Sequence, residues 1–347
     1  MREDRHPGKP RWIKHVIGGG ITLLSLFVFF QQVNFTDVLN ALANFHWIYL
    51  IFGVASLAIG YVLRITRWSM MLRATGARTT FGNCSAPFLG SIALNNVLPL
   101  RIGDMVRALI FPRSMDITRT IATSSLIIER LIDLITLLAC LTFGLFSIQA
   151  LVIPAQLKAS AVFLAITGGI VLTLGFLFSG SLGRFFVHLT STTSSSGWDR
   201  VYGTLGDLFH GFDVMSRPRL LLSMLAVSML VWVGEAGLFY FVLLGTGIDG
   251  SPLVALLVMA IATLSTLVPS SPGYVGTFHL AAFTAISLVG GTAAQAGSYA
   301  VIVHLALWLP TTLAGALAIW ARPEIFQVAS KKNVAIQVVE IGPHEKI

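Results

Sequence analysis

Charged residues are scarce in this chain: Asp, Glu, Lys and Arg make up 11% of its 347 residues. A typical soluble domain carries about 25%. Apolar residues reach 55%, and the mean hydropathy is +0.81. This composition excludes a soluble enzyme and predicts an all-α polytopic membrane protein. The net charge of +8 does not indicate nucleic-acid binding, because the basic residues cluster in short segments between apolar runs, as cytoplasmic anchoring requires.

Cysteine is almost missing, since the chain has only Cys84 and Cys140, both in or beside apolar segments. That count excludes a disulfide framework and a paired-cysteine metal site. The sequence also lacks a hydrolase triad, a Walker loop, a zinc motif and an Asp-x-Asp sugar-nucleotide motif, and Gly18-Gly19-Gly20 lies inside a helical run without a phosphate-loop context. We therefore expect no cofactor, no metal and no catalytic residue.

Long apolar runs are what the sequence does contain. A bilayer-spanning helix needs about 20 apolar residues. Runs of that kind lie near 15–33, 47–68, 120–149, 159–180, 220–247 and 298–321. Two further segments, 84–111 and 253–291, are each long enough for two short helices, and each is interrupted. We expect about eight transmembrane passes, with two broken or re-entrant segments.

Both interruptions carry Pro-x-x-x-Gly, as Pro99 to Gly103 and as Pro269 to Gly273, and the two prolines are 170 residues apart. Backbone groups freed by such breaks cost several kcal/mol each in hydrocarbon, so they persist where protein covers them or where they line a wet cavity. Matching breaks in two halves predict a site near the bilayer midplane. The alternative is a plain kink between packed helices. The residues assigned to this site are Asn95, Asn96, Pro99, Gly103, Pro269, Ser270, Ser271, Pro272, Gly273 and Gly276.

The distribution of arginine predicts the topology. The loop near 31–46 has no Lys or Arg and is placed outside. Arginine-bearing segments are placed inside; they are 64–78, 101–119, 180–219 and the stretch from Arg322 onward. A single crossing at 84–98 would put four arginines outside, whereas a re-entrant hairpin avoids this. Segment 253–291 then starts and ends outside, either as a hairpin or as two crossings. The two broken segments enter from opposite faces, as in an inverted repeat.

The organisation follows from these assignments. Residues 1–14 form a basic cytoplasmic N-terminus before an uncleaved first helix, residues 15–322 form the transmembrane domain, and residues 323–347 form a cytoplasmic tail too short for a catalytic domain. The loop 180–219 contains an amphipathic stretch at 198–215. That stretch is either an interfacial helix on the inner leaflet or a helix packed on the ends of the bundle. We expect an inner (plasma) membrane protein with both termini cytoplasmic.

Ionisable residues inside apolar segments usually face the interior or a cavity. The planar donor fork of arginine suits a lipid phosphate, and the arginines assigned to phosphate binding are Arg64, Arg67, Arg101 and Arg107. The residues assigned to a neighbouring ion-pair network are Asp104, Glu129, Arg130 and Asp133. The alternative is that these arginines only reach toward the inner interface and pair with acids there.

A second group of residues has side chains that can bind and release protons. Glu235 lies in mid-helix, about 24 Å along the helix from Arg219, too deep for its short side chain to reach the interface, so it must be protonated or paired. We assign proton coupling to Glu235 and, more weakly, to His279 and His304. The alternative for each histidine is a satisfied core residue.

Four motifs in order resemble the lysylphosphatidylglycerol synthase transmembrane-domain family, also called the flippase-like or UPF0104 family, over about residues 12–322. They are Arg64-x-x-Arg67-Trp68, Asn95-x-x-x-Pro99-x-Arg101-x-Gly103-Asp104-x-x-Arg107, Glu129-Arg130-x-x-Asp133 and Pro269-Ser-Ser-Pro272-Gly273-x-x-Gly276. The resemblance implies an inner-membrane protein linked to lipid headgroup translocation. In some relatives this domain flips aminoacylated phosphatidylglycerol, and separate soluble domains transfer aminoacyl or glycosyl groups. We expect neither soluble domain within these 347 residues. Aminoacyl-lipid relatives tend to carry Glu where this chain has His279, which weakens a cationic substrate.

The function expected from these observations is movement of an anionic lipid or lipid-linked intermediate between leaflets. Phospholipid, hopanoid and polyprenyl-phosphate lipids all remain open as partners. One alternative is a membrane-embedded lipid-modifying transferase, or its accessory subunit, with Glu129 and Asp133 as its acid-base pair. Another is a non-transporting scaffold that positions lipid-biosynthetic enzymes.

Overall fold

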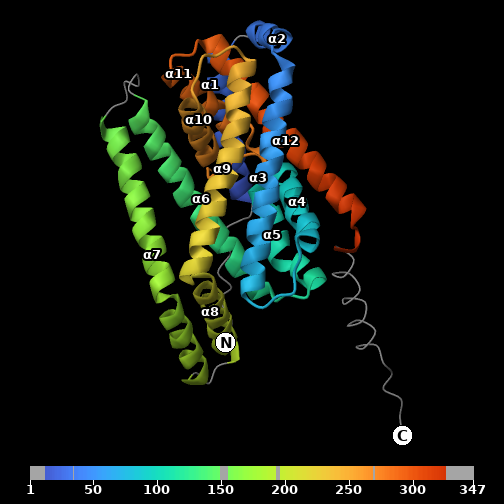
Figure 1. The fold of residues 1–347 in the computed structure, drawn as a ribbon, viewed down its shortest axis with the longest axis vertical. Helices are drawn as coiled ribbons and strands as arrows, with labels where there is room; N and C mark the ends of the chain where they lie inside the picture. Colours follow the sequence, from blue (N-terminus) through green and yellow to red (C-terminus); the bar gives the residue numbers. More distant parts are fainter. Residues whose placement is uncertain (1–11, 34, 149–154, 193–195, 269, 326–347) are drawn as a thin grey trace, which may run out of the picture.

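The computed structural model describes residues 12–33, 35–148, 155–192, 196–268 and 270–325. These ranges are helical, without a strand, and pack into a bundle with one long hairpin at its side (Figure 1). The α-helices are α1 (Trp12–Gln32), α2 (Phe35–Ala43), α3 (Trp47–Ala74), α4 (Phe81–Val97), α5 (Ile102–Leu109), α6 (Arg119–Ser147), α7 (Ala155–Thr192), α8 (Ser196–Met215), α9 (Pro218–Gly245), α10 (Pro252–Ser265), α11 (Thr277–Leu288) and α12 (Ala293–Ala321). Short 3-10 turns are η1 (Pro99–Arg101), η2 (Phe111–Met115) and η3 (Pro272–Tyr274).

Four helices are long and apolar enough to cross a bilayer: α3, α7 over residues 159–190, α9 and α12. Their outward faces carry large exposed apolar side chains, such as Phe52 on α3 and Leu177 on α7, which suit contact with lipid. The prediction of an all-α membrane protein is confirmed. The number of passes stays a prediction.

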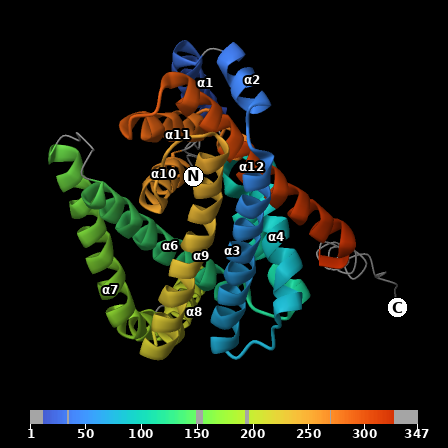
Figure 2. The same ribbon diagram turned by 45° about the horizontal axis from the view of Figure 1, so that its top comes forward.

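The two interrupted segments each form a pair of short helices. In Figure 1, α4 and α5 lie in the lower half of the bundle, whereas α10 and α11 lie in the upper half, and Figure 2 shows the same separation. Their breaks meet, because η3 lies against both η1 and α4. Trp308 of α12 lies beside them, and its indole N–H donates to the Asn96 carbonyl at 3.2 Å. Gly273 has φ +68°, and a Cβ there would lie 2.9 Å from the Trp308 indole nitrogen, so a side chain would not fit.

Helices α3 and α9 pack closely along their length because glycines face each other. A Cβ on Gly234 would lie 3.0 Å from the Cα of Gly60, and the Ser56 hydroxyl donates to the Gly234 carbonyl at 2.9 Å. Small residues at such a contact let helix backbones approach. One turn beyond Gly60 on α3 lies Arg64, and Glu235 directly follows Gly234 on α9. The glycine contact therefore sets these two charged residues side by side.

Four helices are joined by one buried apolar cluster. Met71 near the end of α3, Ile128 in the first half of α6, Met215 at the end of α8 and Met224 near the start of α9 belong to it. The placement of the basic segments on one side of the membrane stays a prediction.

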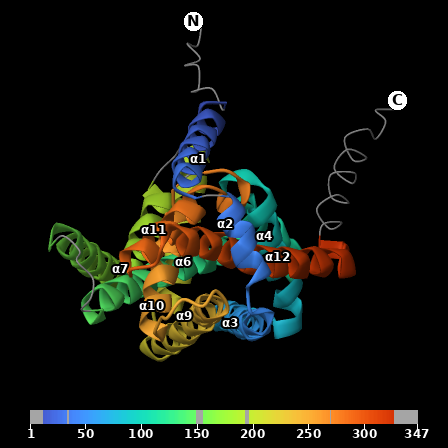
Figure 3. The ribbon, with the colours of Figure 1, turned by 90° about the horizontal axis from the view of Figure 1, so that it is seen from above.

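Two features differ from the expectation. Helix α2 occupies part of the loop predicted near 31–46, with Val38 buried against the core. Residues 180–192, predicted as loop, continue α7, and α8 packs against that extension; the rings of Phe186 and Phe209 stack with their centroids 5.5 Å apart. The amphipathic stretch is thus a helix that packs on protein, and Figure 3 shows α7 beside α6 at the edge of the bundle.

Candidate functional site: a charged cavity between the two breaks

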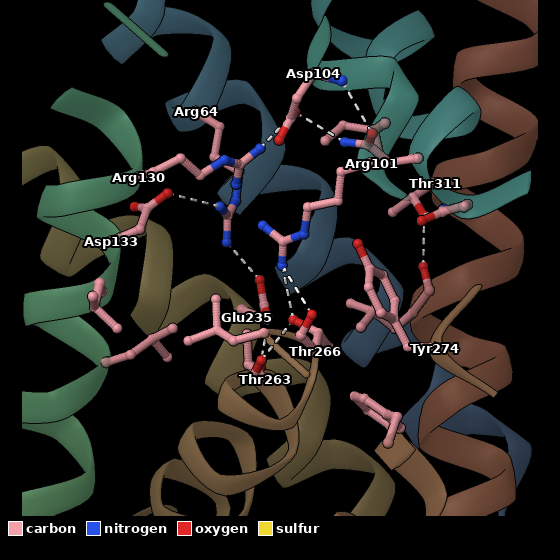
Figure 4. A pocket seen from close by; sticks show the side chains of 18 of the residues that line it. Arg64, Arg101, Asp104, Arg130, Asp133, Glu235, Thr263, Thr266, Tyr274 and Thr311 are labelled. Atoms are coloured by element: carbon pink, nitrogen blue, oxygen red, sulfur yellow. Dashed lines mark hydrogen bonds and ion pairs between the residues drawn. The ribbon is translucent and has the colours of Figure 1, made fainter. Parts of the chain in front are cut away.

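A cavity of about 500 Å³ lies where the two broken segments meet (Figure 4). Its walls come from α3, α4, α5, α6, α9, α10, α11 and α12 together with both breaks. Ten residues predicted as functional line it: Arg64, Asn95, Asn96, Arg101, Asp104, Arg130, Asp133, Glu235, Gly273 and His304. The structure therefore brings together residues from the predicted inner and outer groups in one site.

Arg64 and Glu235 form the ion pair on one wall. The guanidinium Nη2 lies 2.6 Å from Glu235 Oε2, and Nη1 lies 3.8 Å from Asp133 Oδ2. The guanidinium also lies over the Trp232 ring, 4.6 Å from its centroid. The Thr263 hydroxyl donates to the other Glu235 oxygen at 3.3 Å. Glu235 is thus paired, one of the two states that its depth in the helix requires.

Asp104 and Arg130 form the pair on a second wall. Arg130 Nη2 donates to Asp104 Oδ1 at 2.8 Å, and the Asn95 side-chain amide donates to the same oxygen at 2.9 Å. The Asp104 backbone N–H donates back to Asn95 Oδ1 at 3.1 Å. This reciprocal pair joins α4 to α5 and holds the hairpin closed above the first break.

Arg101 lies at the first break itself. Leu100 and Arg101 both have left-handed backbone, with φ of 59° and 52°, which is costly for side chains of this size. Arg101 Nη2 donates to the Thr266 carbonyl at 3.3 Å and to the Thr266 hydroxyl at 3.1 Å, and the guanidinium lies 5.7 Å from the Tyr274 ring centroid. Among the residues that the structure describes, Arg101 has no carboxylate partner.

Arg67 and Arg107, both predicted to bind phosphate, lie outside the cavity lining. Arg67 is 0% exposed and donates to both oxygens of Asp133, at 2.7 and 3.1 Å. Arg107 is 1% exposed and pairs with Glu129 at 2.9 Å. Glu129 is also absent from the lining, although Asp133, four residues later, reaches it. These pairs hold α3, α5 and α6 together.

The two histidines lie next to each other, with ring centroids 4.4 Å apart. His304 lines the cavity, and its Nε2 lies 2.8 Å from the Gly273 carbonyl oxygen. The ring of His279 lies behind it, where its Nδ1 accepts a hydrogen bond from the Gly276 backbone N–H at 3.3 Å. Both rings therefore contact the backbone of the second break, His304 at Gly273 and His279 at Gly276.

The remaining residues of the predicted midplane site shape the breaks. Pro99, Ser270 and Ser271 line a smaller cavity of about 190 Å³ that shares Arg101 with the larger one. A Cβ on Gly103 would overlap the Ser91 carbonyl oxygen of α4. Gly276, with φ +94°, precedes α11, Pro272 begins η3, and Pro269 lies outside the described residues.

Sequence reasoning missed the threonines that hold the charged groups. Thr263 and Thr266 are one turn apart at the end of α10, so one binds Glu235 while the other binds Arg101. Trp232 and Tyr274, which lie beside the two guanidiniums, were also missed. The Thr-x-x-Thr spacing just before the second break was the available signal. The described residues contain no group of three or more His, Cys, Asp or Glu side chains placed to hold a metal ion.

The charges around the cavity do not balance. The closest ion pair of each carboxylate joins Glu235 to Arg64, Asp133 to Arg67, Glu129 to Arg107 and Asp104 to Arg130, and Arg64 also lies 3.8 Å from Asp133. Each carboxylate of the network thus has an arginine of its own, and Arg101 is the fifth arginine. One positive charge is left over, and it lies at the break inside the cavity. Such an arrangement is suited to one bound anion.

Comparisons with known proteins agree with this architecture. Residues 15–315 match the family described as lysylphosphatidylglycerol synthase TM region. A protein named glycosyltransferase AglD, from Haloferax volcanii, is 25% identical over 329 residues, which cover 86% of this chain and 53% of that protein. The chain therefore spans about half the length of this curated relative.

Proposed function

This chain belongs to the lysylphosphatidylglycerol synthase transmembrane-region family, and from that premise we propose that it moves an anionic lipid, or an anionic lipid-linked intermediate, between the leaflets of a membrane. We assign it to the inner (plasma) membrane with both termini in the cytoplasm. The candidate lipids are phospholipids, hopanoids and polyprenyl phosphates.

The observation that carries the proposal is the position of Arg101. It lies in the cavity without a carboxylate partner among the described residues, while the other four arginines of the network are paired. An unpaired guanidinium offers a planar set of donors that suits phosphate oxygens. The two hairpins reach the cavity from opposite ends of the bundle (Figure 1). A headgroup at Arg101 would therefore lie between the two leaflets, while its tails stay in lipid.

Glu235 supplies a way to couple this movement to protons. In its ionised form, the Glu235 carboxylate forms an ion pair with Arg64 at 2.6 Å. Protonation of Glu235 would weaken that pair and free a second guanidinium toward the cavity. His304 and His279 stand beside the second break and are the further proton carriers in this scheme. Arg64 and Arg101 would then hold the phosphate in turn.

The test is lipid movement in reconstituted vesicles, measured as the loss of a fluorescent headgroup analogue from the leaflet that a membrane-impermeant quencher reaches. Arg101→Ala should abolish movement of anionic lipid. Arg113→Ala is the matched control, because Arg113 is exposed on η2 and does not line either cavity. Equal rates for wild type and Arg101→Ala would refute the role of this arginine.

A second candidate is a membrane-embedded lipid-modifying transferase, or its accessory subunit, which the name of the Haloferax relative favours. The acid-base pair proposed for it has little support in the geometry, because Glu129 is 1% exposed against Arg107 and Asp133 is bound by Arg67. Turnover of a radiolabelled lipid donor by the purified protein would favour this candidate, and movement without turnover would favour the first.

A further inference from the structure

In the ionic network around the cavity, each carboxylate pairs with an arginine, and the Arg101 guanidinium has no carboxylate partner among the described residues. We infer that the cavity is built for a single phosphodiester group, which carries one negative charge, and that it discriminates against lipids with a diphosphate. This inference rests on the proposed function, since it takes the ligand to be a lipid. It adds the charge class of the headgroup.

Arg101 differs from the other arginines of the lining in having no carboxylate partner among the described residues. Both hydrogen bonds of Arg101 to Thr266 come from Nη2, so its Nε and Nη1 atoms have no protein partner within the described residues. The other two arginines of the lining already meet a carboxylate at 2.6 and 2.8 Å. One phosphate can therefore be neutralised without breaking an existing pair.

A second phosphate would meet carboxylates. Thr266, which holds Arg101, and Thr263, which holds Glu235, are three residues apart, which is about 4.5 Å of helix rise. Asp104 lies three residues after Arg101 along the chain, and its carboxylate already accepts a hydrogen bond from Arg130. A diphosphate at Arg101 would thus bring its extra charge near Glu235 or Asp104, in a protein interior where like charges repel more strongly than in water.

Two substitutions each change the net charge of the cavity lining by one and keep the shape of the side chain. Glu235→Gln and Asp104→Asn each remove one negative charge from a different wall, and each leaves an arginine unpaired. Both variants should gain affinity for a diphosphate lipid. Arg101→Gln should lose affinity for the phosphodiester, and Arg101→Lys should retain part of it, because it keeps the charge and loses the fork. Arg113→Gln, outside the cavity, is the control.

The experiment is competitive lipid retention, measured by native mass spectrometry on the full chain in mild detergent. The added lipids are phosphatidylglycerol, a polyprenyl phosphosugar and a polyprenyl diphosphate in equal amounts. Wild type should retain the two phosphodiesters over the diphosphate by about tenfold or more, since one uncompensated charge in a partly buried site costs at least that much. The relative retention of the two phosphodiesters tells whether the tails are acyl chains or polyprenyl.

Two results would overturn the inference. The first is that wild type retains the diphosphate as well as or better than the phosphodiesters. The second is that Glu235→Gln and Asp104→Asn both elute as monodisperse protein and both keep the lipid preference of wild type. Two acid variants are used so that, if one of them misfolds, the other still tests the inference. The same samples in vesicles separate this inference from the proposed function. Phosphodiester selectivity without lipid movement would refute transport alone, and movement without selectivity would refute the charge class alone.

Discussion

Arg101 and Thr266 tie the two broken segments to each other. One guanidinium nitrogen of Arg101 donates to both the carbonyl and the hydroxyl oxygen of Thr266, which ends α10. The residues are 165 positions apart: Arg101 lies within the first break, and Thr266 lies just before the second. Because Arg101 is also the cation of the cavity without a carboxylate partner among the described residues, an anion bound there as proposed would share its side chain with the contact between the hairpins.

Thr266→Val should loosen this contact while the carbonyl remains. Loss of one such hydrogen bond costs about 0.5–1.5 kcal/mol, so a small decrease in thermal stability is expected, together with faster lipid movement if the contact holds the hairpins together. Thr284→Val is the matched control, because Thr284 is exposed on α11 and its hydroxyl bonds only to its own helix. Identical melting and transport in the two variants would show that the contact is not used.

Arg107 and Arg101 should behave differently when truncated. Arg107→Ala leaves Glu129 charged and buried, which costs about 3–5 kcal/mol, so the purified protein should melt much lower or fail to fold. Arg107→Met combined with Glu129→Leu should recover most of the stability, since replacing a whole buried pair is often neutral. Arg101→Ala should melt only slightly below wild type, because it loses the hydrogen bonds to Thr266 but leaves no buried carboxylate without its arginine. An Arg107→Ala protein as stable as wild type would contradict a structural role for this ion pair.

Gly103→Ala should break the first hairpin. A methyl group at this position would overlap the Ser91 carbonyl of α4, and backbone cannot give way as a flexible side chain does. The expected result is little monodisperse protein. Gly169→Ala on α7 meets nothing within 4 Å and should be neutral or slightly stabilising. Comparable yields of the two variants would mean that α4 and α5 are less closely packed.

The hairpins can be mapped by single cysteines in a chain whose own two cysteines are replaced. Arg78→Cys and Arg113→Cys flank α4 and α5, whereas Asp249→Cys and Ala293→Cys flank α10 and α11, and all four positions are exposed. A membrane-impermeant maleimide should label the first two from one side and the last two from the other. Labelling of Arg78→Cys and Arg113→Cys from opposite sides would show that α4 and α5 cross the bilayer.

Glu235→Gln should uncouple lipid movement from protons. The amide keeps the shape but cannot release a proton, so a pH gradient imposed on vesicles should no longer change the rate. Wild type should respond to the same gradient. A variant that still responds would move the proton site to His304 or His279, and His304→Asn would be the next protein to measure.

The long apolar runs were enough to predict the helices, because lipid imposes length and hydropathy directly on sequence. The two breaks were also predictable, since proline and glycine act locally. The pairing of charges was not. Glu129 and Asp133 share a helix face, yet one binds Arg107 and the other Arg67, and only the packing of α3, α5 and α6 decides this. The end of α7 was misjudged because polar residues after 180 resemble a loop, whereas contact with α8 keeps them helical.

The meeting of the two hairpins has an electrical consequence. If each hairpin occupies only its own half of the bilayer, the barrier between the two sides is reduced to the short region around Arg101, Thr266 and Gly273, and the membrane voltage falls mainly there. Moving one elementary charge through the full voltage changes its free energy by about 2.3 kcal/mol per 100 mV. A singly charged headgroup would therefore be driven by the membrane potential over a path far shorter than the bilayer, and an electrically neutral one would not be driven at all.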